Sequence, residues 1–350
     1  MRINLKKSFF GEKDFVITEK NGMKAILFKY STGVEAIRIE NTKGYFIILP
    51  FQGQQIWRVN FLGKELVMKT KFDEPVPTTE YLKTYGGFLL HCGFNAFGVP
   101  QKDDNHPQHG ETPNGEFKVA YIDITDDYIA VGGSYHYDVS FTKNYTFTPE
   151  CRLYKDDTIL KININLENRR NSPMEYMYLC HINFRPIDGA ELIYSADYKN
   201  IKIFKNENSS EELSSYIEKV ESTPEIHHKV GEEGQVYNPE ICFALNGYKG
   251  DENNIAYTIQ YASDGASYVS HPVDILPVGI RWISRTGDED SMGMILPATA
   301  EHLGYMNAKR NGQIKLLPPH GKLNFTIETG WLEKPDADKV KKKIESIRNN

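Results

Sequence analysis

The feature that most constrains this chain is an alternation of apolar and polar residues with a period of two. In residues 160–166 leucine and isoleucine alternate with lysine and asparagine, and residues 322–328 repeat the pattern. Because successive strand side chains point to opposite faces of a sheet, such segments predict strands with one buried face. Aspartate-rich turns at 125–127 and 155–157 separate neighbouring stretches of this kind. Strand, short turn and strand again predicts an antiparallel, all-β sandwich or barrel.

Two stretches predict helices. Residues 209–220 are polar and are predicted to form an exposed insertion. They lie within the acidic segment 206–235, which is either a solvated excursion between strands or an interaction surface. Residues 335–348 begin with proline and aspartate, which suits a helix start.

The domain organisation follows from length and continuity. An average domain length would divide 350 residues in two, but all-β sandwiches often exceed that average as one unit. The chain is 40% hydrophobic and 12% aromatic, enough for a large core. No repeat or linker divides it. We predict one domain over 1–350, with a core over about 25–332 and a short helical tail over 333–350.

Charge and cysteine spacing exclude several partners. A net charge of −6 leaves no basic footprint, so neither nucleic acid nor an anionic membrane is a predicted partner. No run reaches the roughly 18 apolar residues of a membrane span, and no signal-peptide core is present, so we predict a cytoplasmic location. The four cysteines lie far apart and predict free buried thiols rather than disulfides or a metal site. The sequence carries no signal for the oligomeric state.

The densest polar cluster spans residues 86–116 and includes His109 and Asn114. Its many glycines and prolines predict loops, and loops on a rigid β scaffold usually carry binding groups. The same residue types also form ordinary turns. Among the polar residues here, His109 is the one for which a functional role is favoured.

A second cluster, at residues 180–185, contains His181 and Asn183. If residues 177–184 form a strand, both side chains lie on one face. A histidine and an amide in an apolar strand need hydrogen-bond partners, because an unpaired buried polar group is costly. The alternatives are a satisfied core histidine and, in combination with His109, a functional pair.

A third cluster begins with Arg281-Trp282 and continues over residues 293–310. A tryptophan can stack on the apolar face of a sugar ring while a neighbouring guanidinium bonds its hydroxyls, although tryptophan is equally often a core residue. Glu301 and Arg310 add polar groups at a predicted rim. The chain has no phosphate-binding glycine loop, no G-x-S-x-G, no H-E-x-x-H and no dinucleotide fingerprint.

The order of these motifs resembles the galactose-mutarotase-like superfamily, which contains the aldose 1-epimerases. More closely, it resembles a bacterial branch described as a domain of unknown function or a hypothetical aldose epimerase. The resemblance spans roughly residues 40–332 and implies a β-supersandwich with a sugar cleft across one sheet face. The motifs that carry it are Gly86-Gly87 with Cys92-Gly93, His109-Gly110, the segment 168–184 ending in His-x-Asn-Phe, Leu276-Pro277 with Trp282, Pro297-Ala298-Thr299, and the last strand ending at Trp331.

The resemblance also implies a chemistry, the mutarotation of a small carbohydrate without a cofactor. A carboxylate takes the proton of the anomeric hydroxyl while a histidine protonates the ring oxygen, so that the ring opens, rotates and closes as the other anomer. His181 matches the acid and His109 matches the second histidine that contacts substrate. The predicted substrate-binding residues are Arg58, Asn114, Asn183, Trp282 and Arg310.

One position departs from the pattern. The related branch commonly has a glutamate, the general base, before Pro-Ala-Thr, where this chain has Leu296. Leucine cannot accept a proton, so Glu301 is the predicted base if a loop brings it back to the cleft. The alternative is a catalytically silent sugar-binding or sensory protein. A lyase or hydrolase would need a pair of carboxylates that the sequence does not define. Hexose, pentose, uronate and phosphorylated sugar all remain open as ligands.

Overall fold

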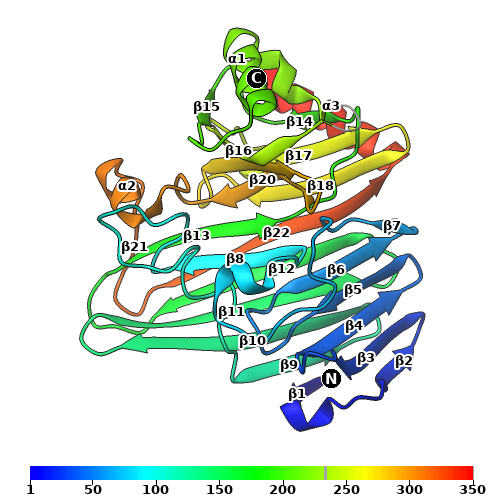
Figure 1. Cartoon of the computed structure of the whole chain (residues 1–350). Helices are drawn as coiled ribbons and strands as arrows, with labels where there is room; N and C mark the ends of the chain where they lie inside the picture. The colour runs from blue at the N-terminus through cyan, green and yellow to red at the C-terminus, as the bar shows by residue number, and fades with distance from the viewer. Residues whose placement is uncertain (232–234, 350) are drawn as a thin grey trace.

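The computed structural model describes residues 1–231 and 235–349, so Glu232 and Glu233 of the predicted acidic segment lie outside the described residues. Two antiparallel sheets, of nine and thirteen strands, face each other and enclose the main apolar core (Figure 1). The N-terminus and the C-terminus lie at opposite ends of the molecule (Figure 1). The predicted all-β supersandwich with a short C-terminal helix is confirmed.

The strands of the two sheets are as follows, in spatial order. The nine-stranded sheet contains β1 (Arg2–Leu5), β9 (Val119–Ile124), β10 (Tyr128–Val139), β11 (Lys143–Tyr154), β12 (Ile159–Asn168), β22 (Lys322–Glu333), β18 (Gly265–Pro272), β17 (Ile255–Ala262) and β14 (Glu191–Tyr194). The thirteen-stranded sheet contains β15 (Ile201–Phe204), β16 (Tyr237–Leu245), β19 (Val278–Arg285), β20 (Asp290–Ala298), β13 (Met174–Ile182), β8 (Leu89–Phe94), β6 (Ile56–Phe61), β5 (Gly44–Ile48), β4 (Glu35–Asn41), β3 (Met23–Lys29) and β2 (Phe15–Lys20), with β7 (Lys64–Glu65) beside β6 and β21 (Lys315–Leu317) beside β13.

The two segments with the clearest alternation are neighbours in the nine-stranded sheet. In β12 the leucines and isoleucines are buried while the intervening lysine and asparagines are half-buried. Ile162 lies opposite Ile327 and Ile164 opposite Phe325 of β22, so both strands present their apolar faces to the same core. Burial of each such side chain contributes about 1.5–3 kcal/mol, which explains why this alternation predicts the strands well.

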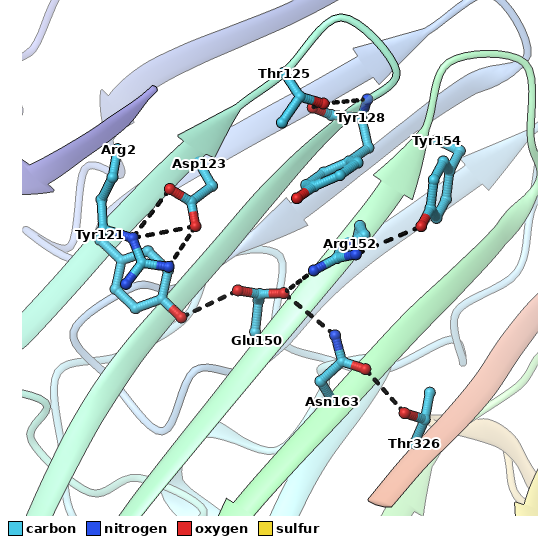
Figure 2. Close-up of polar contacts among 10 residues, drawn as sticks. All are labelled: Arg2, Tyr121, Asp123, Thr125, Tyr128, Glu150, Arg152, Tyr154, Asn163 and Thr326. Atoms are coloured by element: carbon cyan, nitrogen blue, oxygen red, sulfur yellow. Dashed lines mark hydrogen bonds and ion pairs between the residues drawn. The ribbon is translucent and has the colours of Figure 1, made fainter.

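The outer face of the nine-stranded sheet carries a ladder of paired polar side chains (Figure 2). The Arg2 guanidinium lies 3.8 Å from the centroid of the Tyr121 ring, and the Tyr121 hydroxyl donates to Glu150 at 3.1 Å. Arg152 and Asn163 donate to the same carboxylate at 2.8 and 3.2 Å. The carboxylate of Glu150 is thus shared by three donors, and this face is explained as a polar outer surface of the sheet.

Helices occupy the margins of the sandwich. The described α-helices are α1 (Glu211–Ser222), α2 (Gly304–Arg310) and α3 (Lys334–Asn349), and the 3-10 helices are η1 (Lys7–Phe9), η2 (Tyr81–Thr84) and η3 (Pro224–His228). The helix predicted at 209–220 is α1, and it is exposed on one face only rather than throughout. Leu213, Tyr216, Ile217 and Val220 recur at helical spacing and are buried. Helix α2 is too short for a sequence pattern to show.

The cysteines, the potential metal ligands and the helices bear on the predictions made from composition. Cys92, Cys151, Cys180 and Cys242 are buried free thiols. Among the described residues, no group of three or more histidine, cysteine or acidic side chains is arranged to hold a metal ion. No helix in the described part of the chain combines the length and the apolar character needed to cross a membrane.

Candidate active site

A cleft lies on the thirteen-stranded sheet where β16, β19, β20 and β13 run side by side. Three of these strands contribute pairs of residues two positions apart, as the period of a strand requires for side chains on one face, and β20 contributes a single residue. These residues are Leu179 and His181 of β13, Glu240 and Cys242 of β16, Ile280 and Trp282 of β19, and Leu296 of β20. The 3-10 helix η2 adds Tyr81 and Leu82, and loops add Tyr85, Val99, Gln108, His109 and His302. The cleft therefore joins all three polar clusters of the sequence.

His109 and His181 meet edge to face in this cleft. Their ring centroids are 5.2 Å apart, with the planes at 80°. Burial, with the nearby His181 as a second cause, holds the pKa of His109 well below its usual value. Burial lowers the pKa of His181 to about 4. Both imidazoles are therefore neutral at pH 7, and each offers one donor and one acceptor nitrogen.

A close approach of two loops places His109. The His109 backbone N–H donates to the Gly98 carbonyl at 3.0 Å. The N–H of Val99, the residue after Gly98, donates to the His302 carbonyl at 3.0 Å. Gly98 has φ +87°, and a Cβ there would lie 2.0 Å from the His302 carbonyl oxygen. Only glycine allows this contact, which brings His302 to the cleft beside His109.

Asn183 sets the tautomer of His181. The Asn183 side-chain amide donates to the Gly87 carbonyl at 2.9 Å, so its Oδ1 is the acceptor facing His181. His181 Nδ1 lies 2.8 Å from that oxygen and must carry the proton. In the neutral ring, Nε2 is then the basic nitrogen. The prediction that His181 and Asn183 share one face is confirmed by this contact, although β13 itself ends at Ile182.

Two tyrosines close the histidine side of the cleft. The Tyr85 hydroxyl donates to Asn183 Oδ1 at 3.2 Å and lies 3.5 Å from His181 Nε2. The Tyr81 ring lies 4.6 Å from that of His109, and its buried hydroxyl has no partner in the described part of the chain. Burial raises the pKa of both tyrosines well above the usual value, so both stay protonated and can donate.

Glu240 supplies a carboxylate that sequence reasoning missed. The Trp282 indole Nε1 donates to Glu240 Oε2 at 2.5 Å, and the Trp282 ring lies 5.5 Å from that of His181. The pairing of β16 with β19 shifts register between Tyr237 and Ile241, so Glu240 lies at an irregularity of the strand. Its position two residues before Cys242 in an apolar strand was the only available signal.

The structure does not bring Glu301 to the cleft. Glu301 is buried, and its carboxylate accepts a hydrogen bond from Lys202 of β15 at 2.7 Å. Its neighbour His302 lines the cleft instead. The β20 strand ends at Ala298, and the chain after it directs Glu301 toward β15. The loop that the sequence left open therefore presents an imidazole, that of His302, rather than a carboxylate.

Four predicted sugar-binding residues lie outside the cleft lining: Asn183, which is fully buried, and Arg58, Arg310 and Asn114. Arg58 is engaged by backbone carbonyls, at 2.9 Å from those of Trp57 and Gly86 and at 3.1 Å from that of Phe72. Arg310 forms an exposed ion pair with Asp103 at 2.6 Å. The predicted Asn114 is buried, where it donates to the Glu80 carbonyl at 3.2 Å and accepts from Gln55.

Arg281 and Trp282 lie on opposite faces of β19. Trp282 lines the cleft, whereas Arg281 is fully buried on the reverse side. There its guanidinium donates to His227 Nδ1 at 2.6 Å and to the Met294 carbonyl at 3.2 Å. Adjacent residues of a strand cannot serve one ligand from the same face, so the expected pairing of arginine with tryptophan at a sugar is wrong.

Solved structures share this architecture. A candidate aldose 1-epimerase from Klebsiella pneumoniae matches over 99% of this chain and 96% of its own, with TM-score 0.83 and 16% identity. A galactose mutarotase-like protein from Clostridium acetobutylicum covers 90% of this chain and 100% of its own, with TM-score 0.63 and 15% identity. A candidate aldose 1-epimerase from Escherichia coli K12 covers 85% and 98%, with TM-score 0.56 and 12% identity. The fold is thus that of the galactose mutarotase-like proteins.

The family is identified from the sequence. A family model described as a domain of unknown function, DUF4432, matches residues 31–330. The chain belongs to this family. No curated protein matches it. The predicted resemblance to a mutarotase-like branch of unknown function is confirmed.

Proposed function

We propose that this protein is a carbohydrate isomerase that interconverts the anomers of a reducing sugar by general acid–base catalysis. The observation that carries the proposal is the presence of His181, Glu240 and Trp282 in one cleft. Mutarotation needs a group that takes a proton, a group that gives one, and a surface that holds the ring. These three residue types meet those needs, and the galactose mutarotase-like fold supports the assignment.

The proposed reaction begins with the sugar stacked on Trp282. Glu240 takes the proton of the anomeric hydroxyl while the His181 imidazolium gives its Nε2 proton to the ring oxygen. The bond between the anomeric carbon and the ring oxygen breaks, leaving a free carbonyl. After rotation about the adjacent carbon–carbon bond, the ring closes on the other face of the carbonyl and both protons return. His109 orients the substrate by hydrogen bonding.

The environment of His181 suits an acid that gives its proton easily. Burial disfavours the imidazolium and lowers the pKa to about 4, whereas the hydrogen bond to Asn183 favours the charged form. The imidazolium is therefore a strong acid that is scarce at neutral pH. Proton donation by His181 thus predicts an exchange rate that rises as the pH falls from 7 toward 4.

A second function has one observation in its favour. Leu296 lines the cleft where the resembling branch carries its base. A sugar-binding protein without catalysis would keep Trp282 and the histidines and would have no need of a base at residue 296. Glu240 fits either function, because a carboxylate can accept hydrogen bonds from sugar hydroxyls as well as take a proton.

The test is exchange spectroscopy by NMR on a panel of reducing sugars with the wild type, His181→Ala and Glu240→Gln. We expect faster anomer exchange with the wild type and its loss in both variants, with thermal unfolding confirming that they fold. Ligand-induced shifts without acceleration would establish a binding protein. Absence of both acceleration and binding would contradict a sugar function altogether.

A further inference from the structure

We infer that the substrate is an uncharged sugar, and that the cleft discriminates against sugar phosphates and uronates. This inference rests on the proposed function and names the substrate class of the same cleft. It is carried by the charges that the cleft contains and by the positions of the cations around it.

The cleft offers an anionic ligand no positive partner. Among the described residues, its lining contains one carboxylate, Glu240, and no lysine or arginine. Its three histidines are His109, His181 and His302. Burial keeps all three neutral at pH 7 and lowers the pKa of His302 to about 4. The formal charge of the lining is therefore −1, and it comes from the group proposed to act as base.

The nearby cations are engaged elsewhere. Lys202 pairs with Glu301 at 2.7 Å, and Arg310 pairs with Asp103 at 2.6 Å. Arg58 donates to backbone carbonyls, including that of Gly86 at 2.9 Å. Arg281 is buried on the reverse face of β19. To reach a bound phosphate, each of these side chains would have to give up its present contacts.

The remaining lining suits the C–H surface of a neutral sugar. Leu179, Ile280 and Leu296 come from three adjacent strands and are all buried, and Val99 adds a loop contact. A phosphate or carboxylate placed against these side chains would lose its hydration without a compensating hydrogen bond. It would also be repelled by the carboxylate of Glu240.

The experiment compares sugars that share one ring and differ at carbon 6, where the group is either neutral or anionic. NMR measures the anomer exchange of each compound separately. One set is glucose, glucose 6-phosphate and glucuronate, and the other is galactose, galactose 6-phosphate and galacturonate. Saturation-transfer NMR measures binding of the same compounds. We expect kcat/KM for at least one neutral sugar to exceed that of its charged partners by about 100-fold at low salt. We expect the ratio to narrow as salt screens the repulsion.

Each outcome separates the two claims. Equal or faster exchange of a phosphate or uronate would overturn the inference and leave the proposed isomerase intact. If no sugar shows faster exchange, the isomerase is wrong, and the binding measurements still decide the substrate class. Tighter binding of the charged partners, or binding of neither class, would overturn the inference.

A pair of variants supplies a gain-of-function test. Leu296→Arg places a cation in the cleft and should reduce the preference for the neutral sugar at least about tenfold. Leu296→Met changes the shape without charge and should keep the preference. If Leu296→Arg folds and its preference for the neutral sugar is unchanged, charge does not govern which sugar the cleft accepts. If Leu296→Arg does not fold, the comparison of neutral and charged sugars with the wild type remains the test.

Discussion

The Trp282 indole N–H donates to the Glu240 carboxylate across 2.5 Å, and so joins β19 to β16 at the cleft. The same indole ring lies 5.5 Å from the ring of His181. Trp282 therefore contacts both Glu240 and His181, so that a change in its side chain affects the position of the other two. The cleft thus has a carboxylate on β16, that of Glu240, whereas β20 contributes the apolar Leu296.

The first prediction concerns Glu240→Gln. Glutamine keeps the shape and can still accept from Trp282, but it cannot take a proton. We expect kcat/KM for anomer exchange to fall by about 10²–10⁴-fold. NMR exchange spectroscopy measures the rate, and urea unfolding should show little change in the free energy of unfolding because Glu240 is only half-buried.

Glu301→Gln is the matched control for this prediction. It removes a second carboxylate, one that pairs with Lys202 outside the cleft. We expect its exchange rate to stay close to that of the wild type. A large loss in Glu301→Gln with a normal rate in Glu240→Gln would assign the base to Glu301 instead.

The second prediction separates the two roles of Trp282. Trp282→Phe keeps an aromatic face for the sugar and removes the N–H donated to Glu240. We expect kcat to fall by about tenfold, because a charge-assisted hydrogen bond contributes roughly 1.5–3 kcal/mol and its loss leaves the carboxylate misplaced. KM should change less. Trp282→Ala should raise KM strongly, and equal kinetics in the two variants would argue against a positioning role for the indole N–H.

The third prediction concerns Asn183 and the proton of His181. Asn183→Ala removes the Oδ1 that favours the imidazolium, so the pKa of His181 should fall further below its present value of about 4. Asn183→Asp places a negative charge there and should raise it. NMR titration of the imidazole measures both shifts, and the pH dependence of anomer exchange should move with them. Opposite signs would contradict the assigned Nδ1–H donor.

The sequence predicts the fold well because alternation is a local signal with a large energetic cause. The strands at 160–166 and 322–328 are clear for this reason, and the helix at 335–348 is marked by its proline start. The buried face of α1 was missed because its apolar residues Leu213, Tyr216, Ile217 and Val220 are set among serine, glutamate and lysine. Their helical spacing was visible but was outweighed by the average polarity of the segment.

The site was only partly predictable, because closeness in sequence is not closeness in space. Glu301 was preferred as base because it follows Leu296 closely, yet its side chain pairs with Lys202 on β15. Glu240 is far from Leu296 in sequence, but β16 and β20 flank the same strand, β19. His181 and Asn183 could be paired from sequence because two strand residues at spacing two share a face.

The fourth prediction concerns acid stability. His271 is fully buried, neither ring nitrogen has a partner among the described residues, and burial lowers its pKa to about 3. The unfolded chain, with a histidine pKa of about 6.5, binds this proton more readily. The stability from neutral His271 is therefore complete above about pH 6.5 and is lost as the pH falls toward 3. Each pKa unit corresponds to about 1.4 kcal/mol.

His271→Leu tests this sign. It removes the unpaired nitrogens with a side chain of similar volume, so stability at pH 7 should be equal or higher. Urea unfolding between pH 7 and 4 should show a shallower loss than in the wild type. The exposed His136 supplies the control, and His136→Gln should keep the wild-type slope. An unchanged slope in His271→Leu would show that His271 is protonated in the folded protein.

The fifth prediction concerns a glutamate introduced at residue 296 of β20 to replace Glu240 as the proposed base. In the Glu240→Gln background, Leu296→Glu places a carboxylate where the resembling branch carries one. Leu296 is 2% exposed, so the new carboxylate loses hydration and should lower the free energy of unfolding by about 1–3 kcal/mol. If anomer exchange needs only a carboxylate in reach of the bound sugar, the double variant should exchange anomers about tenfold faster than Glu240→Gln alone.

Leu296→Gln in the same background is the control, because it has the shape and polarity of glutamate without its basicity. Recovery with glutamate but not glutamine would show that proton transfer limits the reaction and that two strands of this sheet can supply the base. Equal rates in both double variants, with both folded and binding sugar, would mean that a carboxylate at residue 296 does not reach the anomeric hydroxyl. The carboxylate would then have to come from β16, where Glu240 lies at an irregularity of the strand.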